Sequence, residues 1–109
     1  MRALLDKLGI SAKYKGYRML IYAIEIAVED DTAVSMITKR IYPHIAKEYD
    51  ISPVNVEKNI RMAISAFWTH GNRDLYDKIV GYPITQKPSN AEFIGAISSY
   101  VIRTKEYKR

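Results

Sequence analysis

The chain has 109 residues, a length that fits one domain over residues 1–109 and leaves little room for a second. It contains no cysteine, which excludes disulfides, thiolate catalysis and cysteine-based zinc sites, and its two histidines have no metal-binding spacing. Seventeen Lys and Arg against twelve Asp and Glu give a net charge of +5, which suits a polyanionic partner without identifying one.

Apolar residues recur at helical spacing between turn-forming Gly, Pro, Asn and Asp residues. Residues 2–8 predict a short helix that Gly9 ends, and a stripe over residues 17–28 predicts a longer helix ending at Asp30-Asp31. The helical spacing continues over 33–41. No apolar run approaches the ~20 residues that span a bilayer, and residues 1–10 lack an export signal. We therefore expect a cytoplasmic protein with no membrane contact.

The second half of the chain has clearer helix boundaries. Pro43 either kinks the preceding helix or begins a new one, and we expect a new helix over 43–49. Ser52 as N-cap and Pro53 as first residue predict the start of the next helix, which Gly71 ends. Asn72 then caps a helix over 73–80 that carries Leu75 and Ile79 inward.

A capping box of Ser89 and Glu92 begins the last helix. The segment 82–88 is too short and too interrupted by proline to be a strand. The sequence therefore predicts an all-α, compact domain of five or six helices.

Residues 43–70 have the layout of a helix-turn-helix, with a short helix, a three-residue turn and a longer second helix. A helical wheel from Pro53 divides the second helix into two faces. The inner face carries Val56, Ile60, Ala63, Ile64 and Phe67, and the outer face carries Val54, Asn55, Lys58, Arg61, Met62 and Ser65.

The outer face has residue types that can read DNA bases. Arg61 can pair with guanine, Asn55 with adenine, and Lys58 with guanine or a phosphate. Val54 and Met62 can touch thymine methyl groups, and Glu57 can accept from cytosine or orient a neighbouring arginine. An ordinary solvated helix face is the alternative interpretation.

Phosphate contacts are expected beside this helix. Thr38 and Lys39 precede the motif, and Lys15 lies next to Gly16, between Lys13 and Arg18. The start of the second helix at Ser52 offers free N–H groups that attract phosphate. No catalytic triad, P-loop or dinucleotide-binding glycine motif is present, so we expect neither an enzyme nor a cofactor.

Several motifs, in the same order along the chain, resemble a known family. The two longest are Ile37-Thr38-Lys39-x-x-Tyr42-Pro43-x-Ile45-Ala46-Lys47 and Val56-Glu57-x-x-Ile60-Arg61-x-Ala63-Ile64-x-x-x-Trp68. Shorter matches are Lys15-Gly16-Tyr17, Gly71-Asn72, Gly81-Tyr82 and Lys87-Pro88-x-Asn90-x-Glu92-Phe93-Ile94. Together they resemble the C-terminal DNA-binding effector domain of the stage 0 sporulation protein A family, the master response regulators of sporulation.

The resemblance implies a six-helix domain that binds a short DNA element, often as head-to-tail copies, and regulates transcription. It implies that Val54, Asn55, Glu57, Lys58, Arg61 and Met62 read the DNA. Lys58 and Asn55 stand where the family has Arg, and Met62 where it commonly has His, so we expect a different or looser DNA site. The resemblance also implies a contact between residues 70–80 and the polymerase sigma subunit, although Arg73, Tyr76 and Lys78 depart from the family pattern.

The family's receiver domain has no counterpart in residues 1–109, so an excised domain and a stand-alone relative both remain open. Two functional hypotheses follow. The first is sequence-specific binding of double-stranded DNA with transcription regulation. The second is a helical protein-interaction or regulatory module that has lost specific DNA binding.

Overall fold

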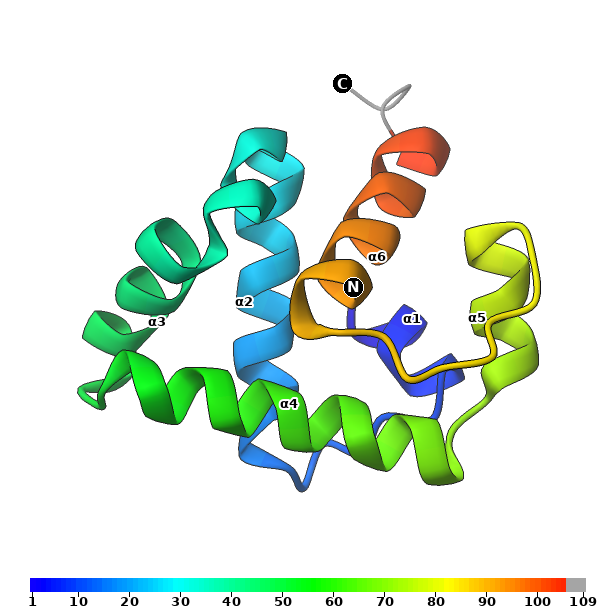
Figure 1. The fold of residues 1–109 in the computed structure, drawn as a ribbon, viewed down its shortest axis with the longest axis horizontal. Helices are drawn as coiled ribbons and strands as arrows, with labels where there is room; N and C mark the ends of the chain where they lie inside the picture. The colour runs from blue at the N-terminus through cyan, green and yellow to red at the C-terminus, as the bar shows by residue number, and fades with distance from the viewer. Residues whose placement is uncertain (106–109) are drawn as a thin grey trace.

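The computed structural model describes residues 1–105, which form six α-helices, a 3-10 segment and a π-helical turn (Figure 1). No strand occurs among these residues. The predicted all-α fold of five or six helices is therefore confirmed, and the described residues form six. The elements in chain order are α1 Arg2–Lys7, α2 Lys15–Glu29, η1 Asp31–Met36, η2 Ile37–Ile41, α3 Tyr42–Tyr49, α4 Pro53–His70, α5 Arg73–Val80 and α6 Asn90–Lys105.

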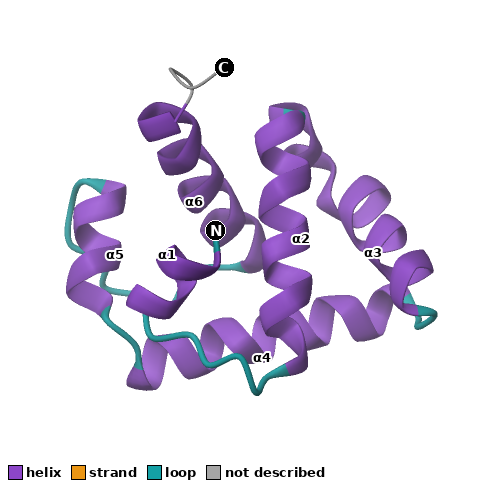
Figure 2. Ribbon diagram, turned by 180° about the vertical axis from the view of Figure 1, so that it is seen from behind, coloured by secondary structure: helices purple, strands orange, loops and turns teal. Residues whose placement is uncertain are grey.

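Helix α4 runs across one end of the molecule, and α2, α3 and α6 pack against it (Figure 1). Helix α2 packs against both α4 and α6, and α3 packs against α4. The view from behind shows α1 lying between α6 and the connection into α2, with α5 on the far side from α3 (Figure 2). One apolar core lies between the helices, and α4 closes it from one side with its buried stripe of Val56, Ile60, Ala63, Ile64 and Phe67.

Local capping signals explain why the helices begin and end where they do. The Ser52 hydroxyl oxygen accepts a hydrogen bond from the Asn55 amide at 3.1 Å, and Pro53 follows as the first residue of α4. The Asn72 side-chain oxygen caps α5 by accepting from the Leu75 amide at 3.1 Å. The predicted capping box before α6 is complete, because Ser89 and Glu92 exchange two hydrogen bonds of 2.8 and 3.1 Å.

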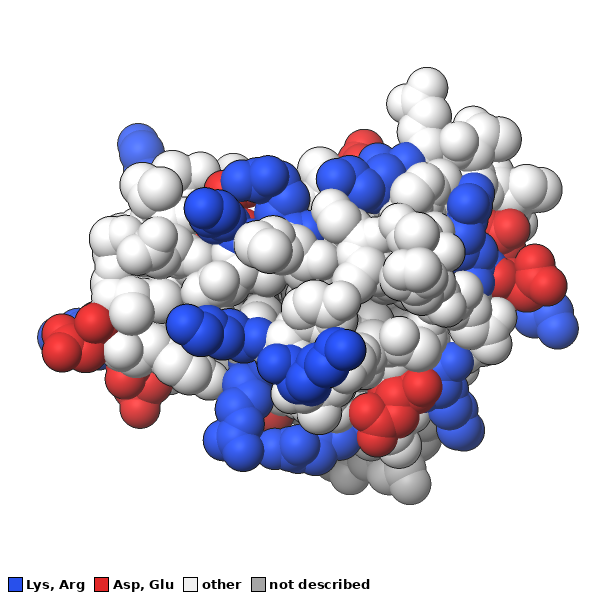
Figure 3. All heavy atoms as spheres, turned by 90° about the horizontal axis from the view of Figure 1, so that it is seen from below, with Lys and Arg blue, Asp and Glu red and all other residues white. Residues whose placement is uncertain are grey.

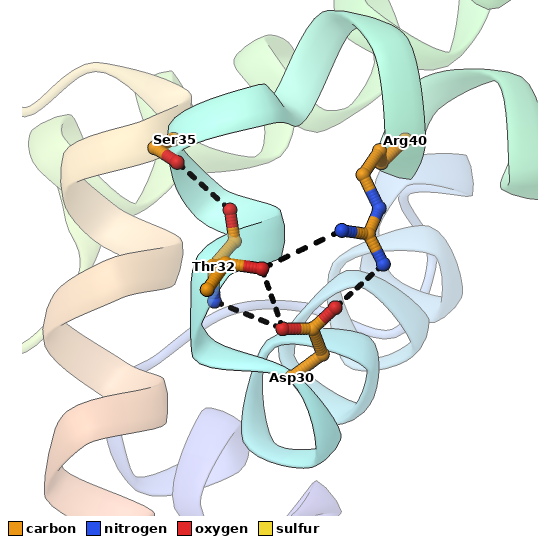
Figure 4. Close-up of polar contacts among 4 residues, drawn as sticks. All are labelled: Asp30, Thr32, Ser35 and Arg40. Carbon is orange, nitrogen blue, oxygen red and sulfur yellow. Dashed lines mark hydrogen bonds and ion pairs between the residues drawn. The ribbon is translucent and has the colours of Figure 1, made fainter.

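The segment 33–41, expected as a continuation of helical spacing, is not a regular α-helix. Asp30 leaves α2 in an extended conformation, and its carboxylate accepts from both the amide and the hydroxyl of Thr32, which starts the tighter η1 turn (Figure 4). Met36 then departs from helical geometry at φ −124° and ψ 38°, and η2 follows with π-helical hydrogen bonding. Helical periodicity predicted a helix here but not its type.

An ion pair fixes this irregular segment to the end of α2. Arg40 donates from Nη2 to the Asp30 carboxylate at 2.5 Å and from Nη1 to the Thr32 hydroxyl at 3.4 Å (Figure 4). The hydrogen bonds from Thr32, with the Arg40 guanidinium, lower the pKa of Asp30 below its ordinary value. The Arg40 guanidinium is thus held by contacts within the domain, while Thr38 and Lys39 on the same turn remain exposed.

The buried face of α5 differs in part from the prediction, which placed Leu75 and Ile79 inside. Tyr76 and Ile79 are buried, and Leu75 is only half-buried. The Tyr76 ring stacks on Phe93 and meets Phe67 edge-on, with a distance of 5.3 Å between ring centroids in both pairs. Aromatic packing between α4, α5 and α6 therefore favours burial of Tyr76. Burial raises the pKa of Tyr76 to about 12.

Helices α2 and α4 touch backbone to backbone at Gly16. A Cβ built at Gly16 would lie 2.0 Å from the carbonyl oxygen of Asn59 and 3.1 Å from the Cβ of Ala63. Only glycine allows this approach. The contact fixes the start of α2, and therefore Lys15, against the side of α4.

Candidate nucleic-acid interface

Helices α3 and α4 form the predicted helix-turn-helix. Asp50 ends α3 in the left-handed conformation at φ 55°, and the Ile51 amide donates to the Ala46 carbonyl at 3.0 Å. Residues 50–52 form the turn, and Ser52 is the N-cap of α4. Because α4 buries the predicted stripe, its opposite face is turned outward.

The six residues predicted to read bases all lie on α4, on or beside its outer face. Val54 and Met62 are 73% and 49% exposed. Asn55, Lys58 and Arg61 are also exposed, whereas Glu57 is half-buried. Figure 3 views the molecule from the side on which α4 lies, and Lys and Arg gather across this face while most acidic groups lie toward its edges.

Glu57 holds Arg61 in one orientation. The Arg61 Nε donates to one carboxylate oxygen of Glu57 at 2.9 Å, and Nη2 approaches the other at 3.5 Å. This contact uses one side of the guanidinium group and leaves donors on Nη1 and Nη2 free at its end. An arginine held in this way can still present two parallel donors to a planar acceptor pair.

A cationic groove of about 670 Å³ runs along one side of the outer face of α4. Helix α4 contributes Asn55, Lys58 and Met62 to its lining, and none of the described residues that line it carries a carboxylate. Its other cations are Lys13, which precedes α2, and Lys15 and Arg18 in the first turn of α2. The structure therefore brings Lys15 beside the base-reading candidates, as a phosphate contact would require.

A second groove of about 350 Å³ runs along the other side of the outer face. Thr38 lines it together with Glu57 and Arg61, and Lys87 reaches it from the loop between α5 and α6. Lys39 is exposed on η2 and is absent from the lining of both grooves. The sequence showed Lys87 only as part of a family motif and gave it no role, because no local pattern shows that this loop returns to α4.

Ser52 serves as the cap of α4. Its oxygen accepts from the Asn55 amide, and its hydroxyl proton remains able to donate to an anion. Asn90, which the sequence showed only as part of the same family motif, is buried. It donates from Nδ2 to the Tyr42 hydroxyl at 2.9 Å and to the Glu57 carbonyl at 3.2 Å. Burial raises the pKa of Tyr42 above its ordinary value. Asn90 thus fixes α4 relative to α3 and α6.

Residues 1–101 match the family model of the sporulation initiation factor Spo0A C terminal. The chain belongs to this family. The Spo0A C-terminal family consists of DNA-binding effector domains of sporulation response regulators, not of enzymes, and the match includes α3, α4 and both grooves. The predicted resemblance is therefore confirmed. Within residues 1–105, no helix combines the length and apolar character needed to cross a bilayer.

Proposed function

We propose that this domain binds a specific sequence of double-stranded DNA through α4 and regulates transcription. The observation that carries the proposal is the position of the outer face of α4 between two grooves that each contain cations. A major groove is ~12 Å wide and accepts one α-helix, so the two DNA backbones lie on either side of that helix. Cations on both flanks match this arrangement.

Each base-reading candidate then has a specific role. We assign the free end of the Arg61 guanidinium to guanine O6 and N7, and its contact with Glu57 supports this role by orienting the group. Asn55 suits adenine, and the exposed side chains of Val54 and Met62 suit thymine methyl groups. Lys58, lining the 670 Å³ groove, suits guanine or a nearby phosphate.

The phosphate contacts are assigned to both flanks and to the start of α4. Lys15 is assigned to the phosphates beside the 670 Å³ groove. Thr38 and Lys39 are assigned to the phosphates on the opposite side of α4. Ser52 lies at the start of α4, where the helix dipole favours an anion.

Two further proposals concern assembly. We propose head-to-tail pairing of two copies on DNA, and a contact between α5 and the polymerase sigma subunit. On α5, Tyr76 is buried and Arg73 stacks over the Trp68 ring at 3.4 Å, which leaves Asp74 and Lys78 as exposed charged residues for that contact. Sedimentation of the domain on duplexes with one or two binding sites tests the pairing, and co-precipitation of sigma with Lys78→Glu tests the second contact.

Selection from a random DNA pool at near-physiological salt tests the main proposal. Enrichment of a motif is the expected result. Arg61→Ala should then lower affinity for that motif by about 1–3 kcal/mol and relax the preference at one base position. Lys39→Ala should weaken binding to all sequences. It should also make the salt slope, the slope of log K against log salt concentration, shallower by about one unit.

A helical protein-interaction module is the second candidate function. The 73% exposure of Val54 and the 49% exposure of Met62 favour it, because apolar side chains on an outward face also suit a protein partner. Failure of the random pool to yield an enriched motif would support this candidate and contradict base reading by Arg61.

A further inference from the structure

The loop between α5 and α6, residues 81–89, is held firmly at both of its ends. Near the start, the Ile84 amide donates to the Asp77 carboxylate at 3.0 Å. Near the end, Pro88 is buried and Ser89 closes the capping box of α6. The next residue, Asn90, donates to the Glu57 carbonyl of α4 at 3.2 Å. The loop is therefore fixed against α4 in the same turns that carry Glu57 and Arg61.

Lys87 reaches α4 from this loop. Its Nζ donates to the Ser65 hydroxyl at 2.9 Å, a contact between residues 22 positions apart. Ser65 follows Arg61 by four residues and therefore lies one turn further along the same face of α4. Lys87 and Arg61 also line the same 350 Å³ groove, together with Thr38.

The charge of Lys87 is not neutralised in this groove. Among residues 1–105, Glu57 is the one carboxylate residue in the groove lining, and it pairs with Arg61. Lys87 forms no ion pair with a described carboxylate. One hydrogen bond to Ser65 uses one of the three ammonium donors and leaves two for an anion.

We propose that Lys87 contacts a DNA phosphate beside the C-terminal half of α4, and that loop 81–89 thereby adds a third element to the DNA interface. This inference rests on the proposed binding of DNA by α4. Lys15 lies on the opposite side of the outer face. Each lysine would therefore contact one of the two DNA backbones that border the major groove. A compact ammonium group suits a phosphate, and it contributes affinity without selecting a base.

The test measures binding of the wild type, Lys87→Gln, Lys87→Arg and Ser65→Ala to the selected duplex and to an unrelated one over a range of salt concentrations. Lys87→Gln should weaken binding to both duplexes by a similar factor, keep the base preference, and make the salt slope shallower by about one unit. Lys87→Arg, which keeps the charge, should retain the wild-type slope.

Two controls separate a phosphate contact from a structural role. Ser65→Ala removes the hydrogen bond but keeps the charge, so its slope should equal that of the wild type. Lys78→Gln removes the same charge in the last turn of α5, which runs away from α4 in Figure 1, and should also retain the slope. A thermal unfolding curve for each variant confirms that the fold is kept.

Three results would overturn the inference. These are an unchanged slope for Lys87→Gln, a Ser65→Ala variant that reproduces the full loss, or a Lys78→Gln variant that loses as much slope as Lys87→Gln. Failure of the wild type to prefer any DNA would instead refute the proposed function itself, and with it the inference.

Discussion

Replacing Gly16 with alanine tests the backbone contact between α2 and α4. The added Cβ would lie 2.0 Å from the Asn59 carbonyl oxygen and 2.7 Å from its carbonyl carbon, whereas ordinary contacts begin at 3.4 Å. No side chain can rotate away, because the obstructing atoms are backbone. The two helices must therefore separate by more than about 1 Å, and overpacking of this kind costs about 1–3 kcal/mol.

A helix gains up to about 1 kcal/mol when alanine replaces glycine, but Gly16 lies in the first turn of α2, where the gain is smaller. We therefore expect Gly16→Ala to lower the free energy of unfolding by about 2 kcal/mol and Tm by about 8–12 °C. Urea and thermal unfolding followed by circular dichroism and by fluorescence of Trp68, the single tryptophan, measure both quantities.

Gly95 in α6 provides a matched control for the same substitution. A Cβ there would meet only Val34, at an ordinary distance of 3.6 Å. Gly95→Ala should therefore raise stability by about 0.5–1 kcal/mol through helix propensity. A Gly16→Ala variant as stable as the wild type, or stabilised like Gly95→Ala, would refute the reasoning.

Three further predictions concern single contacts. Because the pKa of Asp30 is lowered in the fold, its stabilising effect is present above its ordinary pKa and is lost as the pH falls through the lowered value. The difference in urea midpoint between wild type and Asp30→Asn should thus be largest above about pH 5 and shrink in acid; a constant difference would contradict this. Asn90→Ala should cost about 1–3 kcal/mol in urea unfolding, because the buried Tyr42 hydroxyl and the Glu57 carbonyl lose their donor, and a neutral effect would show that other groups replace it. Glu57→Gln should reduce discrimination between the selected duplex and a single-base variant severalfold in competition binding. Less than about 0.5 kcal/mol should be lost in stability, because a partly exposed (i, i+4) ion pair contributes little to folding. Unchanged discrimination would show that Glu57 does not orient Arg61.

The helix boundaries were predictable because their signals are local. Ser52 with Pro53, Asn72, and Ser89 with Glu92 each act within one helical turn, and the structure contains all of these caps. The two faces of α4 were predictable for the same reason, since the periodicity of one helix determines which residues share a face. The segment 31–41 was not predictable to this detail, because the 3-10, α and π forms share nearly the same spacing over a few residues.

Features that depend on contacts between residues far apart in the chain could not be predicted from the sequence. The 2.0 Å distance at Gly16 depends on how α2 crosses α4, and the inward turn of Tyr76 depends on Phe93 in another helix. Lys87 and Asn90 reach α4 from the loop before α6 and from its first residue. The sequence therefore predicted which residues form the outer face of α4, but not the contacts that fix or flank that face.

The buried amide of Asn90 has an evolutionary consequence. It donates to the Tyr42 hydroxyl and to the Glu57 carbonyl, so a change at position 42 alone removes one of its acceptors. Losing one partner of a buried hydrogen bond costs more than replacing both with apolar groups. Positions 42 and 90 should therefore vary as a pair across relatives, with an apolar residue at one accompanying an apolar residue at the other, even though 48 positions separate them in the chain.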